Sequence, residues 1–135
     1  CQLIDISLSD RKGIENLSAI VGMNSFGSFL WQKNLDNQIN IPLFLTGGTF
    51  DLVTPSISEQ LELLLALTSN SLSRVLLIEG ASHFSPIRVE GQMYQTKGKD
   101  LFNLGESIVG HHPISVQSLL AFEITSFLEK LEKNK

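Results

Sequence analysis

The sequence predicts an α/β fold of three layers, in which a sheet of about three parallel strands lies between helices. Three short runs are apolar at nearly every position, and such runs are typical of strands that are covered on both faces of a parallel sheet. Segments with apolar residues at helical spacing follow these runs, so strands and helices alternate along the chain. The two observations together indicate a sheet with a helical layer on each face.

The three predicted strands span residues 17–21 (LSAIV), 41–45 (IPLFL) and 74–78 (RVLLI). A short helical turn at 25–32 is expected to link the first two strands. If the first strand lies at the edge of the sheet, its backbone groups have no partner on one side. Such an edge would pair with a strand from an absent part of the same gene product or from another subunit.

A helix is expected between the second and third strands. Thr54 and Pro55 predict its start, with the threonine as N-cap and the proline at the first helical position. The polar run 69–71 is expected to end it. Its apolar residues recur at helical spacing, at Ile57, Leu61, Leu64 and Leu65.

A long loop and a closing helix complete the predicted domain. Residues 85–113 contain glycines and prolines and no sustained periodicity, so they predict an extended loop. Residues 115–133 predict a helix, in which Lys130 and Lys133 stand where positive charge stabilises the C-terminus. Its apolar stripe comprises Leu120, Ile124, Phe127, Leu128 and Leu131. Right-handed crossovers would put the two linking helices on one face of the sheet, so the closing helix must cover the other.

The composition is that of one soluble domain, with 135 residues, 42% apolar and 18% charged side chains. A net charge of −4 without a basic stripe argues against nucleic-acid binding. No apolar run reaches the roughly 18 residues that a membrane span needs. The single cysteine, Cys1, excludes an internal disulfide framework, which favours a reducing compartment such as the cytoplasm. Because residue 1 is not methionine, we expect the natural product to begin further upstream.

Two polar side chains follow neighbouring strands at the point where each strand ends. Asp51 comes just after the second predicted strand, and His83 just after the third. Ligand sites of parallel sheets form at the carboxyl ends of strands, and neighbouring strands lie about 4.8 Å apart. A carboxylate there would fix the tautomer of the imidazole and leave its other nitrogen free as a base. The simpler interpretation is that Asp51 caps a turn and His83 lies in a surface loop.

Three segments carry a family resemblance: NSFGSFLW, INIPLFLTGGTFDLVTPSISEQ and RVLLIEGASHFSPI. They resemble the C-terminal half of α/β-hydrolases, and are similar in particular to predicted dienelactone hydrolases related to platelet-activating-factor acetylhydrolases. The resemblance covers about residues 17–90, and the closing helix matches by position. The residues that fit the family's second and third segments are Gly48, Asp51, Pro55, Glu59 and Gln60, then Ile78, Glu79, Gly80, His83 and Phe84.

The resemblance implies a serine-type hydrolase that acts on an ester, a lactone or a similar acyl substrate. It implies that Asp51 is the acid and His83 the base of a Ser-His-Asp triad, with no metal and no cofactor. Residues 1–135 would then be one partial α/β-hydrolase domain, the C-terminal portion. The family's nucleophile elbow, G-x-S-x-G, is absent from the chain, so the nucleophilic serine is expected upstream of Cys1. This chain alone would be inactive.

Other candidate nucleophiles and ligands are weaker. Ser25 follows a strand and is followed by Gly27 at the elbow spacing, but Met23 stands where the tight turn needs a small residue. Cys1 precedes the first strand and lies at a terminus that is expected to fray. The adjacent pair His111-His112 lacks further metal ligands, and the loop TGGT at 46–49 lacks the lysine and the spacing of a phosphate-binding loop.

The sequence leaves one function of another class open. A small α/β module could use its open strand edge or the long loop to assemble with a partner. Through the exposed strand 17–21 that partner could be a second copy or the absent N-terminal half. In that case Asp51 and His83 would have no catalytic role.

Overall fold

The computed structural model of the chain describes residues 17–27, 40–87 and 113–134. Within these ranges the elements are β1 (Ile20–Met23), β2 (Leu43–Gly48), the π-helix η2 (Ile57–Leu61), α2 (Glu62–Leu67), β3 (Arg74–Ile78) and α3 (Pro113–Lys133). The expected helical turn at 25–32 lies mostly outside the described residues, as do most of the loop 85–113, Cys1 and the pair His111-His112.

The three strands form one parallel sheet in the order β1-β2-β3. In its register, Ile20 is paired with Leu43, and Phe44 with Arg74. The central strand β2 is buried along its whole length, whereas β1 alternates between half-buried and exposed positions. The predicted α/β class and the parallel sheet are therefore confirmed, and β1 is an edge strand of the sheet that the described residues form.

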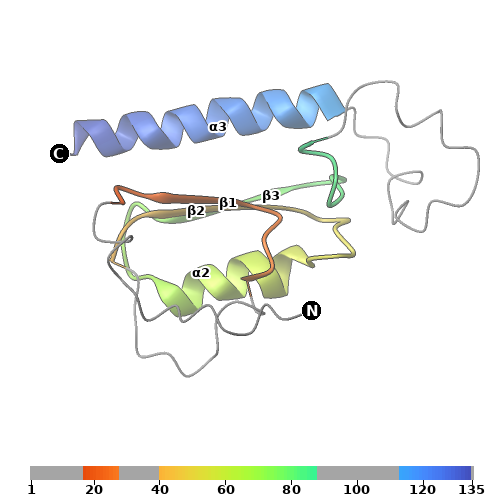
Figure 1. The fold of residues 1–135 in the computed structure, drawn as a ribbon, viewed down its shortest axis with the longest axis horizontal. Helices are drawn as coiled ribbons and strands as arrows, with labels where there is room; N and C mark the ends of the chain where they lie inside the picture. The colour runs from red at the N-terminus through yellow and green to blue at the C-terminus, as the bar shows by residue number, and fades with distance from the viewer. Residues whose placement is uncertain (1–16, 28–39, 88–112, 135) are drawn as a thin grey trace, which may run out of the picture.

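The helices cover the two faces of the sheet, α2 one face and α3 the other (Figure 1). Successive residues of β2 point to opposite faces. Accordingly, Leu43 and Leu45 pack with Leu63 and Leu67 on the α2 side. On the α3 side the buried cluster comprises Phe44, Phe127 and Leu131. The expected arrangement, with the closing helix opposite the linking helix, is confirmed.

Two of the three strands differ from the prediction at both ends. The first strand is Ile20–Met23 and not 17–21, and the second is Leu43–Gly48 and not 41–45, so β2 continues through Gly47 and Gly48. At both glycines another part of the chain lies too close to leave room for a side chain. A Cβ on Gly47 would lie 2.7 Å from the Cβ of Ser56, and one on Gly48 would run into the backbone carbonyl of Ala81. The third strand has the predicted bounds.

The helix between β2 and β3 begins later than predicted, and in a different form. Its N-cap is Ser56, whose side chain makes no capping hydrogen bond, so the predicted capping role of Thr54 is wrong. The first turn is a π-helix, a form that frequently occurs near functional sites. The helix ends at Leu67, where the N–H of Thr68 donates to the carbonyl of Leu64.

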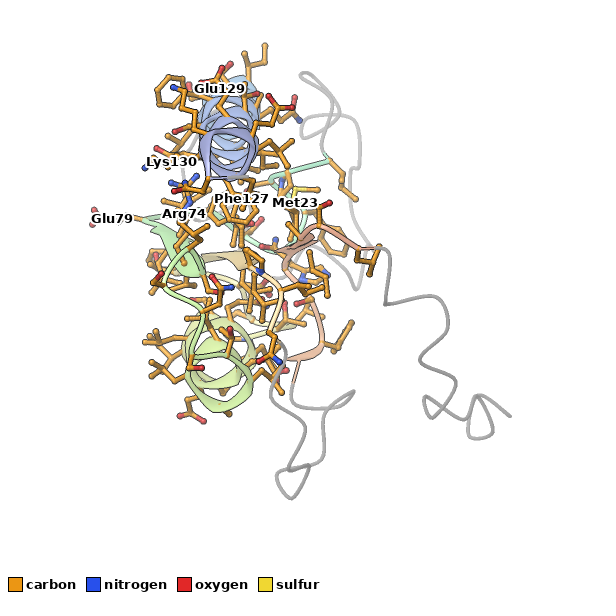
Figure 2. All side chains as sticks on the ribbon, turned by 90° about the vertical axis from the view of Figure 1, so that its left-hand side faces the viewer. Met23, Arg74, Glu79, Phe127, Glu129 and Lys130 are labelled. Carbon is orange, nitrogen blue, oxygen red and sulfur yellow. The ribbon has the colours of Figure 1, made fainter. Side chains whose placement is uncertain are left out.

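Arg74 joins the start of β3 to α3, which explains an arginine in an otherwise apolar strand. Its guanidinium lies 4.4 Å from the ring centre of Phe44 and 5.4 Å from that of Phe127. Figure 2 shows Arg74 beside Phe127 of α3. The guanidinium also donates to the backbone carbonyl of Glu123 and lies 3.6 Å from that residue's carboxylate.

The predicted apolar stripe of α3 is buried at three positions, whereas Leu128 is 46% exposed. Within the described ranges, no helix has the length and the apolar character that a membrane span requires.

Candidate active site

The structure brings Asp51 and His83 together at the carboxyl end of the sheet. Asp51 follows β2 and His83 follows β3. The Nδ1 atom of His83 lies 3.0 Å from Oδ2 and 3.2 Å from Oδ1 of Asp51. The carboxylate is completely buried, whereas the imidazole is 17% exposed. The pair therefore has a protected acidic side and an imidazole that reaches the surface.

The loop after β2 holds the carboxylate of Asp51 in one orientation. Its Oδ1 accepts the backbone N–H groups of Val53, at 3.0 Å, and of Thr54, at 2.7 Å. Its Oδ2 accepts the hydroxyl of Thr54, also at 2.7 Å. Aspartate favours such local turns because its short side chain can reach the backbone two and three residues on. An ionised carboxylate only accepts hydrogen bonds, so these three donors suit it.

The imidazole of His83 is held between this carboxylate and two aromatic rings. The ring centre of Phe84 lies 5.0 Å away, with the two planes nearly perpendicular, and that of Phe26 lies 6.1 Å away. Because the neighbouring carboxylate is acceptor-only, we assign the proton of the neutral imidazole to Nδ1. The lone pair of Nε2 then points away from Asp51. This nitrogen can act as a general base.

Asn24 ties the ends of all three strands together, a role that the sequence analysis missed. Its side-chain amide donates to the carbonyls of Ser82, at 3.3 Å, and of His83, at 2.6 Å. Its own N–H donates to the carbonyl of Thr46. Its φ of 46° is left-handed, a conformation that asparagine tolerates better than most residues. The available signal was its position, since it is a third polar residue that follows a predicted strand within a few residues.

Ser25, the candidate nucleophile within the chain, is bound by Gln60 of η2. Its hydroxyl donates to Oε1 of Gln60 at 3.0 Å, and the amide of Gln60 donates to the carbonyl of Ser25 at 2.8 Å. Gln60 is completely buried. The single hydroxyl proton of Ser25 is thus directed to the helix and not to the imidazole of His83.

Thr54 is the second residue of the site that the sequence analysis missed. Its side chain lies beside both members of the pair, with Oγ1 2.7 Å from Asp51 and 3.0 Å from His83. A threonine before a proline is also a common helix start, and that pattern led to the wrong prediction. The spacing Asp-x-x-Thr, which places the hydroxyl three residues after the carboxylate, was the available signal.

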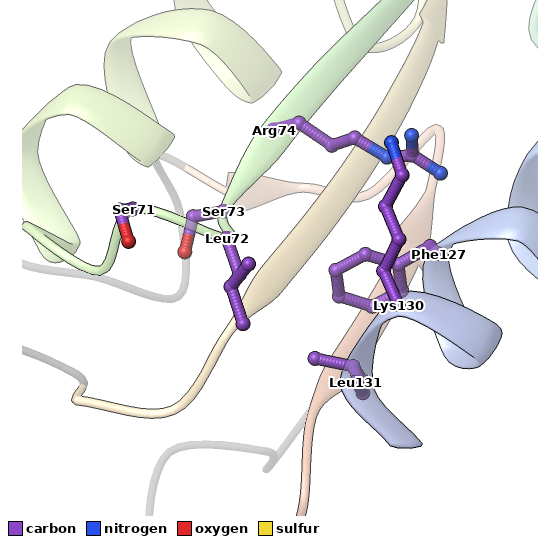
Figure 3. Close-up of a pocket in the computed structure, with 7 residues that line it drawn as sticks. All are labelled: Ser71, Leu72, Ser73, Arg74, Phe127, Lys130 and Leu131. Atoms are coloured by element: carbon purple, nitrogen blue, oxygen red, sulfur yellow. The ribbon is translucent and has the colours of Figure 1, made fainter. Parts of the chain in front are cut away.

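A shallow pocket of about 160 Å³ lies at the opposite end of the sheet (Figure 3). Arg74 and Lys130 line it, between the start of β3 and the last turns of α3. Because the strands are parallel, this end is remote from the loops that carry Asp51 and His83. The guanidinium of Arg74 is already engaged by Glu123 and two aromatic rings, so its evident role is structural.

The chemistry that the described residues offer is therefore that of an acid–base pair. In the part of the chain that the structure describes, no three histidine, cysteine, aspartate or glutamate side chains are grouped as metal ligands would be. Comparisons with protein-family models, with curated proteins and with solved structures find no match to this chain.

Proposed function

We propose that the chain is the C-terminal portion of a serine-type hydrolase that acts on an ester, a lactone or a similar acyl substrate. The observation that carries this proposal is the buried carboxylate of Asp51, 3.0 Å from Nδ1 of an imidazole whose other nitrogen faces away. Its place at the carboxyl ends of parallel strands supports it, because ligands bind there in open α/β sheets. The resemblance of the surrounding segments to α/β-hydrolases agrees with the same assignment.

In the proposed reaction, Nε2 of His83 takes the proton of a serine hydroxyl as its oxygen attacks the acyl carbon. Asp51 stabilises the imidazolium that forms. The imidazolium then gives the proton to the departing alkoxide, and the acyl group stays on the serine. In the second half of the cycle His83 takes a proton from water, the hydroxide attacks the acyl carbon, and the proton returns to the serine oxygen.

The nucleophilic serine of this proposal lies in sequence upstream of the chain. The chain contains no G-x-S-x-G segment. The hydroxyl of Ser25 is hydrogen-bonded to Gln60, and Met23 occupies the place where a nucleophile elbow has glycine. These observations favour an external serine over Ser25.

The test uses the longest polypeptide encoded by the reading frame that contains this chain. Hydrolysis of a p-nitrophenyl ester and labelling by a fluorophosphonate are measured for that protein and for Asp51→Asn and His83→Gln. Each substitution is expected to lower kcat roughly 10³- to 10⁴-fold, as removal of a triad member does. Glu79→Gln, which changes an exposed acid just after β3, is the matched control and should retain full activity.

Two results would contradict the proposal. One is hydrolysis that is unaffected in both Asp51→Asn and His83→Gln. The other is labelling of the 135-residue chain by itself that is lost in Ser25→Ala, because it would make Ser25 the nucleophile.

The edge of β1 favours a second candidate function, a non-catalytic module that assembles through this strand. Val21 is 36% exposed and Met23 47% exposed, although both belong to a strand of the sheet. Apolar side chains on an open edge are an unusual feature for an isolated domain. On this alternative, Asp51→Asn and His83→Gln would leave the biological role unchanged, whereas changes in β1 would abolish it.

A further inference from the structure

We propose that Thr54 is a positioning residue for the acid–base pair, which fixes the orientation of the Asp51 carboxylate and with it the proton on Nδ1 of His83. The catalytic meaning of this role rests on the proposed hydrolase function. The claim that Thr54 orients Asp51 and His83 is independent of that function, because it concerns only contacts among the described residues. From the sequence, Thr54 was expected only to cap a helix.

The hydroxyl of Thr54 has three polar neighbours. Its Oγ1 lies 2.7 Å from Oδ2 of Asp51, 3.0 Å from Nδ1 of His83 and 3.2 Å from the carbonyl oxygen of Asn24. The residue is completely buried, so water does not compete for these contacts. The hydroxyl therefore lies at the meeting point of the three segments that follow β1, β2 and β3.

The proton of this hydroxyl has one best position. A hydroxyl has one proton to donate and two lone pairs to accept with. The charged carboxylate is both the closest and the strongest acceptor, so the proton points to Asp51. A lone pair of Oγ1 then faces His83, and Nδ1–H has three surrounding acceptor oxygens, one from Thr54 and two from Asp51.

The opposite tautomer would break this arrangement. With its proton on Nε2, His83 would present a lone pair at Nδ1 to the carboxylate of Asp51. Thr54 could then donate to Nδ1 only by withdrawing its proton from Asp51, which would leave two acceptors facing each other. The hydroxyl thus couples the orientation of the carboxylate to the tautomer of the imidazole.

Thr54 also holds the carboxylate at both oxygens. Its backbone N–H donates to Oδ1 of Asp51 at 2.7 Å, and its hydroxyl donates to Oδ2 at the same distance. Rotation of the carboxylate would break both bonds. During base catalysis the new proton arrives at Nε2, on the other side of the ring, so this network need not rearrange. Such pre-organisation is what a general base requires.

The experiment is NMR spectroscopy of the chain labelled with ¹⁵N-histidine, at a pH where the imidazole is neutral. Long-range ¹H–¹⁵N correlations show which ring nitrogen of His83 carries the proton, and the exchange rate of that proton with water is measured. His83→Gln identifies the resonances. The variants are Thr54→Val, which removes the hydroxyl at nearly constant shape, and Thr54→Ser, which keeps it.

Thr46→Val is the matched control, because Thr46 is also buried but its hydroxyl has no hydrogen-bond partner among the described residues. We expect wild type, Thr54→Ser and Thr46→Val to carry a slowly exchanging proton on Nδ1. In Thr54→Val this proton should exchange at least about tenfold faster, because a hydrogen bond to a charged group is lost. Unchanged exchange and an unchanged tautomer in Thr54→Val would overturn the inference.

If Thr54→Val fails to fold, the wild-type spectrum still decides the question, since a proton on Nε2 in the wild type would overturn the inference. The proposed function is tested separately by ester hydrolysis in the longer protein. Hydrolysis that is absent while the NMR result holds would refute the proposed function alone. Hydrolysis that is present while Thr54→Val exchanges as wild type would refute the inference alone.

Discussion

Individual residues of the site differ in how far the sequence reveals them. Asp51 and His83 could be predicted because each follows an apolar run, and parallel strands place such residues at one edge. The partners of Asn24 could not be predicted, because they are the carbonyls of Ser82 and His83, far along the chain. Thr54 fits two patterns, a helix cap and a turn partner of Asp51, and only the packing of η2 decides between them.

Buried hydroxyl groups give a prediction at this scale. Thr46 has no hydrogen-bond partner for its Oγ1 among the described residues, so its hydroxyl is desolvated without compensation. Thr46→Val removes that hydroxyl, and valine suits a strand equally well. We expect the free energy of unfolding to rise by about 1 kcal/mol, measured by urea denaturation.

The comparison variant is Thr54→Val, which makes the same chemical change where the hydroxyl contacts Asp51 and His83. It should lower the free energy of unfolding by about 1–3 kcal/mol. A Thr46→Val protein that is less stable than wild type would show that its hydroxyl has a partner after all.

The secondary-structure elements were predicted in kind and order, but not at their ends. Runs of apolar residues identify β2 and β3, because both faces of these strands are covered, although β3 is only half-buried. The extension of β2 through Gly47 and Gly48 could not be predicted, because glycine is common in turns and its role here depends on distant neighbours. The π-turn of η2 has no sequence signal of its own. Gln60 lies in this turn, and its side-chain amide is hydrogen-bonded to Ser25.

The end of β2 gives the prediction at this scale. A Cβ on Gly48 would overlap the backbone of Ala81, which cannot move without displacing the loop that carries His83. Gly48→Ala should therefore lower the free energy of unfolding by about 3 kcal/mol, measured by urea denaturation.

Gly22→Ala is the matched control, since the nearest atom to its added Cβ is the end of the Leu45 side chain, at 2.9 Å. That side chain can adjust, so the cost should be about 1 kcal/mol or less. Equal costs for Gly22→Ala and Gly48→Ala would refute the argument that the backbone of Ala81 requires glycine at the end of β2.

At the scale of the whole molecule, the three-layer arrangement follows from sequence because strand order and crossover handedness leave few alternatives. The sequence does not identify the partner of β1, because the sequence of an edge strand is the same whichever strand pairs with it. Among the described residues, the structure identifies which backbone groups of β1 have no neighbouring strand. The N–H groups of Ile20 and Asn24 donate to β2, through the carbonyls of Pro42 and Thr46. Backbone groups alternate in direction along a strand, so those of Val21 and Met23 face the open edge.

This alternation allows a test of the edge that leaves the existing sheet intact. If the longer polypeptide proposed above pairs one of its strands with β1, the upstream segment expressed separately should bind the 135-residue chain. Val21→Pro removes the N–H that faces the open edge and leaves the hydrogen bonds between β1 and β2 in place. Proline is tolerated at such edge positions. We expect it to weaken the association at least about tenfold, because a backbone hydrogen bond is lost and the ring obstructs the incoming strand. Val21→Thr keeps the N–H and should bind within a few-fold of wild type, as measured by analytical ultracentrifugation. If Val21→Pro instead binds as wild type does, the upstream segment contacts the chain elsewhere and β1 is a true edge of the fold.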